Sequence, residues 1–61
     1  MLYENVKALA IKKGLSIPTL EAKAQLSNGA IGKWRTSSPS VENLSKVAKV
    51  LEVTVNELIQ E

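Results

Sequence analysis

Residues 16–34 constrain the fold of this chain more than any other stretch, because they predict two short helices joined by a tight turn. Their sequence is SIPTLEAKAQLSNGAIGKW, in which Ser16 and Ser27 are each placed to cap the start of a helix. The turn is too short for the two helices to lie antiparallel. Five apolar residues are expected to face inward: Leu20, Ala24, Leu26, Ile31 and Trp34.

The second of these helices, expected over residues 27–36, has an outward face that is small, polar, basic and partly bare of side chains. It carries Asn28, Gly29, Gly32 and Lys33. Each glycine costs a helix roughly 1 kcal/mol relative to alanine, so two glycines three residues apart indicate a close approach by another group. DNA is one candidate, since a helix of this kind fits the major groove, and tight packing by another helix is the other.

Helical periodicity also dominates the flanking sequence, and no window alternates like a strand. Apolar residues spaced for one helix face run through residues 2–13, and Gly14 follows as a typical residue after a helix end. Ser40 is placed to cap a further helix, and a T-x-x-E capping box begins at Thr54. The sequence therefore predicts a compact all-α domain of five helices over residues 1–61.

Composition excludes several classes of protein. The chain has no Cys and no His, which removes disulfides, thiolate metal sites and the commonest general base. It also lacks a clustered carboxylate pair and a Gly-rich phosphate loop, so we expect no enzyme activity, no cofactor and no metal site. The longest apolar run, residues 8–11, is far below the roughly 20 residues of a membrane helix, and no signal peptide is recognisable. These features favour a cytoplasmic protein that does not bind membranes.

Charge is distributed unevenly, although the net charge is only +2. All eight Lys and Arg residues lie within residues 1–49, together with three Glu, whereas residues 50–61 contain three Glu and no basic residue. This pattern is typical of a basic working surface with an acidic far end.

Several short motifs also occur in a specific order and spacing. They are Gly14-Leu15-Ser16, Leu20, Ala24, Leu26-Ser27-Asn28-x-Ala30-Ile31-x-x-Trp34, Pro39-Ser40-x-Glu42-Asn43-Leu44, Val47-Ala48 and Leu51-x-Val53-Thr54-Val55-x-Glu57-Leu58. On these motifs the chain from Val6 to Ile59 resembles the Cro/repressor-type, or XRE, helix-turn-helix family of phage repressors and small bacterial regulators.

The resemblance implies a lambda-repressor-like fold and a transcriptional repressor that binds a double-stranded DNA operator as a homodimer. In this family the first helix of the motif, here within residues 16–36, lies across the major groove and the second helix enters it. The implied base contacts are Asn28, Gly29 and Lys33, because Asn can bond adenine and Lys can donate to guanine. The implied contacts to the DNA backbone are Ser16, Ile17, Ser27, Gly32, Arg35, Thr36, Ser37, Ser38, Ser40 and Asn43.

The sequence departs from the family pattern at several positions. Gln25 and Glu52 stand where Gly is common, so each is expected in a left-handed conformation at some cost. Ile17 replaces a polar residue that touches phosphate, which leaves only its backbone N–H for that contact. A common Arg–Glu pair between the first helix and the end of the recognition helix is replaced by Ala10 and Arg35. We hypothesise that Arg35 is therefore free to contact the DNA backbone.

Alternatives remain for individual residues and for the whole chain. Trp34 is expected in the core from its register with Ile31, the other possibility being a base stack. Asn28 and Lys33 either contact bases or lie on solvated surface. The domain is either a DNA-binding regulator or a helical protein-interaction module of the same fold that has lost DNA binding.

The dimer surface and the extent of the protein also stay open. Val50, Val55 and Ile59 are the apolar residues that the predicted core accounts for least. The chain is either a complete small protein or the N-terminal domain of a longer repressor.

Overall fold

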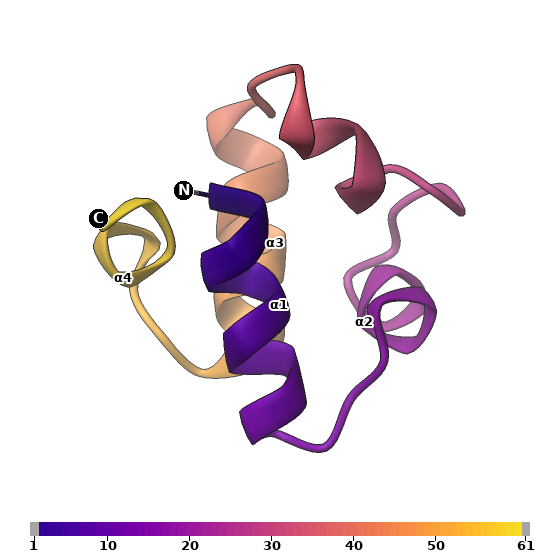
Figure 1. Cartoon of the computed structure of the whole chain (residues 1–61), viewed down its shortest axis with the longest axis vertical. Helices are drawn as coiled ribbons and strands as arrows, with labels where there is room; N and C mark the ends of the chain where they lie inside the picture. The colour runs from indigo at the N-terminus through magenta and orange to yellow at the C-terminus, as the bar shows by residue number, and fades with distance from the viewer. Residues whose placement is uncertain (1, 61) are drawn as a thin grey trace.

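Four α-helices and one short 3₁₀ helix make up the part of the chain that the computed structural model describes, residues 2–60 (Figure 1). In chain order they are α1 (Leu2–Lys12), α2 (Ile17–Lys23), η1 (Ile31–Arg35), α3 (Val41–Leu51) and α4 (Val55–Ile59). Residues 2–60 contain no strand, which confirms the predicted all-α class. Met1 and Glu61, the two ends of the predicted 1–61 domain, lie outside the described residues.

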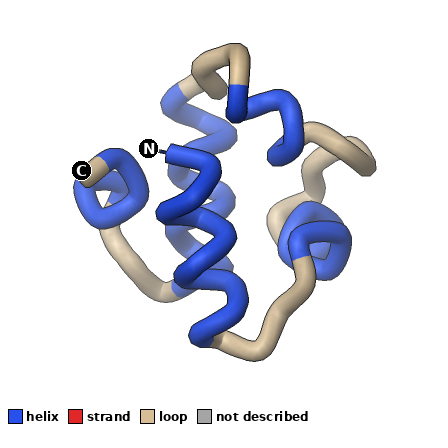
Figure 2. The backbone as a smooth tube through the Cα atoms, viewed as in Figure 1, coloured by secondary structure: helices blue, strands red, loops and turns tan. Residues whose placement is uncertain are grey.

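The elements are arranged around α1. This helix contacts α2, η1 and α4, while α3 contacts α2 and α4. In Figure 1, α2 and α4 lie on opposite sides of α1, and η1 with the loop that follows it lies at the upper end of the view. Short loops join the helices (Figure 2). Together, η1 and the loops on either side of it hold every predicted base contact and seven of the ten predicted backbone contacts.

All five elements contribute to one buried core. Its members are Val6, Ala10, Leu20, Ala24, Ile31, Trp34, Leu44, Val47, Ala48, Leu51 and Leu58. Trp34 retains only 8% of its surface, which confirms the prediction that it packs inside and rules out a base stack in this conformation. Leu26, also expected inward, is half-buried against the core.

Serine and threonine side chains cap the starts of three helices as the sequence predicts. The Oγ of Ser16 accepts a hydrogen bond from the N–H of Thr19 at 3.2 Å, and the Oγ of Ser40 accepts one from Asn43 at 3.2 Å. Thr54 and Glu57 form the reciprocal capping box at the start of α4. Each such cap typically contributes about 1 kcal/mol to helix stability.

The helices α1, α2 and α3 all end in the same way. A residue with positive φ follows each helix: Gly14 (75°), Gln25 (61°) and Glu52 (60°). The next N–H then reaches back five residues, from Leu15 to Ala10, from Leu26 to Glu21 and from Val53 to Ala48, at 2.8–3.0 Å. In each case the donor is an apolar residue packed against the core, as is usual for this type of helix end. The expected left-handed conformations of Gln25 and Glu52 are confirmed.

The prediction of an α-helix over residues 27–36 is wrong, and with it the count of five α-helices. Residues 28–30 form a turn in which Gly29 has φ +88°, a value that a right-handed helix cannot contain. The N–H groups of Ala30, Lys33 and Thr36 bond to carbonyls three residues back, which gives the short 3₁₀ helix η1. Ser27 does not cap this helix, because η1 begins after Ala30 and has no side-chain cap.

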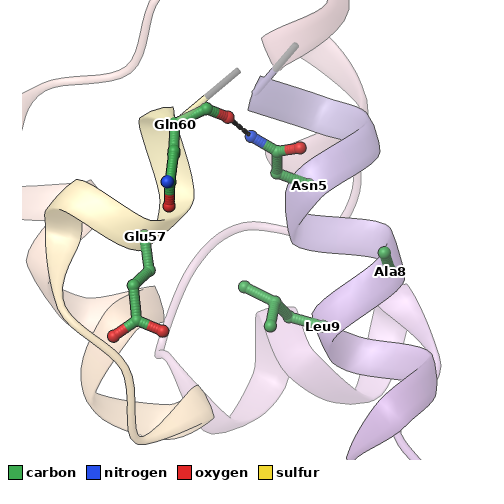
Figure 3. A pocket seen from close by; sticks show the side chains of 5 residues that line it. All are labelled: Asn5, Ala8, Leu9, Glu57 and Gln60. Carbon is green, nitrogen blue, oxygen red and sulfur yellow. Dashed lines mark hydrogen bonds between the residues drawn. The ribbon is translucent and has the colours of Figure 1, made fainter.

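Two side chains, one on α1 and one directly after it, contact the C-terminal part of the chain. The amide of Asn5 donates from Nδ2 to the carbonyl oxygen of Leu58 at 3.0 Å. It also donates to the carbonyl oxygen of Gln60, as Figure 3 shows. Lys13 Nζ lies 2.8 Å from Glu52 Oε1 in an exposed ion pair. The hydrogen bond and positive charge of Lys13 hold the pKa of Glu52 below its ordinary value.

Candidate nucleic-acid interface

A hollow of about 270 Å³ lies between the turn before η1 and the start of α3. It is lined by Ser27, Asn28, Ala30, Lys33, Trp34, Ser37, Ser38, Pro39 and Asn43. Six of these were predicted DNA contacts: Ser27, Asn28, Lys33, Ser37, Ser38 and Asn43. The lining thus combines hydroxyl, amide and ammonium groups and includes no carboxylate, which is the chemistry that suits a phosphodiester backbone.

The other predicted contacts lie outside this hollow. Ser16 and Ser40 use their Oγ atoms as helix caps, although each hydroxyl can still donate a hydrogen bond. Ile17, at the start of α2, is half-buried against the core, so its side chain is engaged in packing. Thr36 is exposed just after η1, and its hydroxyl lies 3.4 Å from the carbonyl of Lys33.

The two glycines of this surface face open space. A Cβ atom added at Gly29 or Gly32 would meet no atom within 4 Å. Tight packing by another helix of this chain is therefore not the reason for either glycine. Gly29 is explained by its positive φ, which L-residues rarely adopt. Gly32 has no positive φ that would require glycine. Because Gly32 has no side chain, the exposed side of η1 is open to an approaching molecule.

Glu21 fixes the start of η1 from inside the molecule, a role that the sequence analysis missed. Its side chain is only 3% exposed. One carboxylate oxygen accepts a hydrogen bond from the N–H of Gly29 at 3.0 Å, and the other accepts one from Ile31 at 2.9 Å. The helical spacing of α2 does indicate an inward position for Glu21, because this residue continues the inward stripe that begins with Ile17 and Leu20.

Arg35 is bound to α1, although not by the family's usual ion pair. Its Nη2 lies 3.0 Å from the hydroxyl of Tyr3, and its guanidinium carbon lies 4.3 Å from the centre of the Tyr3 ring. The cation and the ring face attract each other in this arrangement. Arg35 is thus held beside α1, with other N–H donors of the guanidinium left for a further partner.

A profile of the helix-turn-helix family matches residues 6–58, which cover α2, η1 and α3 completely. The chain belongs to the XRE-type helix-turn-helix family. A search of curated proteins gave no match. The members of this family are DNA-binding transcriptional regulators, and the match places this XRE-type domain in that functional class.

The charges of the XRE-type domain leave this surface basic. The ion pairs found within residues 2–60 join Lys13 to Glu52 and Lys46 to Glu42, so neither engages Lys33 or Arg35. The nearby carboxylate of Glu21 is buried and directed at backbone N–H groups. Lys33 and Arg35 therefore supply exposed positive charge without a carboxylate partner on the described part of the chain.

Three further observations concern the rest of the domain. A second hollow, of about 370 Å³, lies between α1 and α4 and contains no predicted contact residue; Asn5, Ala8, Leu9, Glu57 and Gln60 line it (Figure 3). Among residues 2–60, no three acidic, His or Cys side chains gather so as to hold a metal ion. In the same range, no helix is long and apolar enough to cross a membrane.

Proposed function

We propose that residues 1–61 form one DNA-binding domain of a bacterial or phage transcriptional repressor, which acts in the cytoplasm on a specific operator. The observation that carries this proposal is the hollow beside η1. It gathers six residues that were selected from the sequence as DNA contacts, and its lining includes hydroxyl, amide and ammonium groups but no carboxylate. That combination is expected of a surface that meets the phosphates and base edges of a duplex.

In this proposal two side chains read bases and two glycines let the protein approach the groove. Asn28 bonds an adenine edge, and Lys33 donates to a guanine. Gly29 and Gly32 contribute no side chain, so the backbone of η1 can come close to the base edges. The hydroxyl and amide groups around the hollow, with the starts of α2 and α3, hold the phosphates on either side.

The domain is proposed to bind as a homodimer to two half-sites about one helical turn apart. Ile59, which is 50% exposed on α4, and half-buried Val55 are the apolar residues that we assign to the contact between the two copies. Both belong to the short helix α4, on the side of α1 away from α2 (Figure 1).

Selection of binding sites from a random duplex pool, followed by titration of affinity against salt, tests the function. An enriched, two-fold symmetric site is expected, and four phosphate contacts would lower affinity about a hundredfold between roughly 50 and 200 mM salt. Lys33→Gln should weaken binding to the selected site more than Lys12→Gln does. Lys12 provides the matched control, because it ends α1 at the end away from η1 (Figure 1). No enriched site and no salt dependence would favour the interaction module instead.

Arg35 is proposed to contact a phosphate while it stays against Tyr3. Arg35→Ala should then weaken binding similarly on every sequence and flatten the salt dependence by about one unit. Tyr3→Phe, which removes the hydroxyl partner but keeps the ring, should leave that slope unchanged. An unaltered slope in Arg35→Ala would contradict the proposed phosphate contact.

A further inference from the structure

The buried carboxylate of Glu21 is the least expected feature of this fold. It lies on α2, eight residues before Gly29 and ten before Ile31, yet it accepts the N–H groups of both. With 3% exposure it has little water to solvate its oxygens, so these two bonds replace that solvation. A side chain of one helix therefore occupies the position that a local cap would normally fill at the start of the next.

The segment that Glu21 holds has few constraints of its own. Residue Ala30 precedes η1 without a side-chain cap, and η1 is five residues long. Gly29, which is one of the two donors to Glu21, and Gly32, which follows the other donor Ile31, have no side chains to pack. The carboxylate holds this backbone together with the 3₁₀ hydrogen bonds, the core side chains Ile31 and Trp34, and the Arg35–Tyr3 contact.

The two bonds also determine which groups face outward. The N–H groups of Gly29 and Ile31 point to the carboxylate, so neither can donate to a DNA phosphate or base. These bonds flank Ala30, between the two residues assigned to base reading, Asn28 and Lys33. The orientation of those side chains relative to α2 therefore depends on the position of the Glu21 oxygens.

We propose that Glu21 is a positioning residue for base recognition, an inference that rests on the proposed DNA-binding function. Its carboxylate sets the backbone between Asn28 and Lys33, so that their side chains meet base edges in one fixed orientation. Glu21 itself does not touch DNA. Its loss should weaken discrimination between sequences more than it weakens the attraction to DNA in general.

Comparison of Glu21→Gln with two control variants tests this role. Gln keeps the volume but offers one acceptor oxygen and an NH₂ group where two acceptors are needed. Glu57→Gln removes the same charge from the α4 capping box, and Ile31→Val loosens the same segment without touching the carboxylate. Affinity is measured for each folded variant on the selected operator and on random duplex.

Glu21→Gln is expected to bind the operator at least about tenfold more weakly, the scale of one lost base contact, with less than about a twofold change on random duplex. Both controls should keep the wild-type ratio of the two affinities. Equal losses on both duplexes in Glu21→Gln, or the same loss of ratio in Ile31→Val, would overturn the positioning role. Absence of any salt-dependent binding by the wild-type protein would instead overturn the proposed function itself.

Amide hydrogen exchange provides a measurement that needs no DNA. In the wild type, the N–H groups of Gly29 and Ile31 should exchange slowly although Gly29 is exposed, and in Glu21→Gln they should exchange faster while core amides such as Val47 do not change. Fast exchange of both amides in the wild type would overturn the inference even if no Glu21 variant folded.

Discussion

At the scale of single residues, the ends of the helices show how much conformational cost the chain tolerates. Gly14 meets the positive φ after α1 without strain, whereas Gln25 and Glu52 adopt the same conformation with a Cβ atom. The bonds and apolar contacts that follow each residue are the same in all three cases. The geometry of the helix end therefore dominates over the preference of the individual residue.

Gln25→Gly should stabilise the protein by roughly 1 kcal/mol, because glycine removes the left-handed strain while the hydrogen bonds remain. Urea unfolding with a common slope for both proteins would measure the gain. Gln25→Ala is the matched control, since alanine keeps the Cβ atom and should give no comparable gain. An equal gain from alanine would show that the glutamine side chain, not the backbone conformation, causes the cost.

The ion pair between Lys13 and Glu52 predicts a pH dependence. Because Lys13 lowers the pKa of Glu52 in the folded state, the pair stabilises the fold above the ordinary pKa of 4.5. That contribution is lost as the pH falls through the lowered value in the folded protein. Lys13→Gln should therefore be less stable than wild type near neutral pH, and the difference should disappear once the pH is well below the lowered pKa of Glu52, as measured by thermal unfolding. Raised salt should shrink the difference, since both side chains are exposed.

At the scale of elements, the α-helices could be predicted and the 3₁₀ helix could not. The starts at Ser16, Ser40 and Thr54 and the ends at Gly14, Gln25 and Glu52 are set by residues within one or two turns. The turn at residues 28–30 and the start of η1 are held in part by Glu21, which belongs to the preceding helix. Local periodicity places Ile31 and Trp34 correctly inside and puts Glu21 on the inward stripe of α2, but it does not identify the backbone N–H groups that Glu21 binds.

The candidate site, like the secondary structure, could be predicted from the sequence only in part. The sequence motifs supplied the residue types around η1, and six of the thirteen predicted contacts line one hollow. The exact set could not be predicted, because the hollow depends on how the loop after η1 folds back beside the turn before it. The sequence also could not show that two of the predicted contact residues have partners within the protein. Ile17 packs against the core, and Arg35 binds Tyr3.

The two glycines near η1 should respond differently to alanine. Gly29→Ala should destabilise the fold by about 1 kcal/mol, because φ +88° is strained for an L-residue even though the added Cβ meets no atom. Gly32→Ala should keep or raise stability, by up to about 1 kcal/mol, since alanine has the higher helix propensity. If the backbone of η1 approaches DNA closely, Gly32→Ala will nevertheless bind the selected operator more weakly. Unfolding and DNA titrations on both variants separate strain from contact, and undiminished operator affinity in Gly32→Ala would contradict the close approach.

At the scale of the whole molecule, the proposed DNA surface and the proposed dimer contact lie on different elements. The former surrounds η1, and the latter is on α4, which Asn5 fastens to α1. Ile59→Ser should therefore leave folding and half-site binding unchanged, because Ile59 is 50% exposed, but should reduce cooperative binding to a full operator. Titration of half-site and full-site duplexes measures both effects. Unchanged affinity for the full site would place the dimer contact elsewhere.

The repeated helix end after α1, α2 and α3 has a consequence for the thermodynamics of recognition. At each of these helix ends, a backbone hydrogen bond reaches back five residues and an apolar residue packs against the core. The connection after the helix therefore does not act as a hinge. Little backbone freedom then remains to be lost when the protein docks, and the entropic cost of association falls mainly on side chains and on overall tumbling. With only two side chains proposed to read bases, the domain can in this way retain affinity, because its backbone is already ordered before it meets its partner.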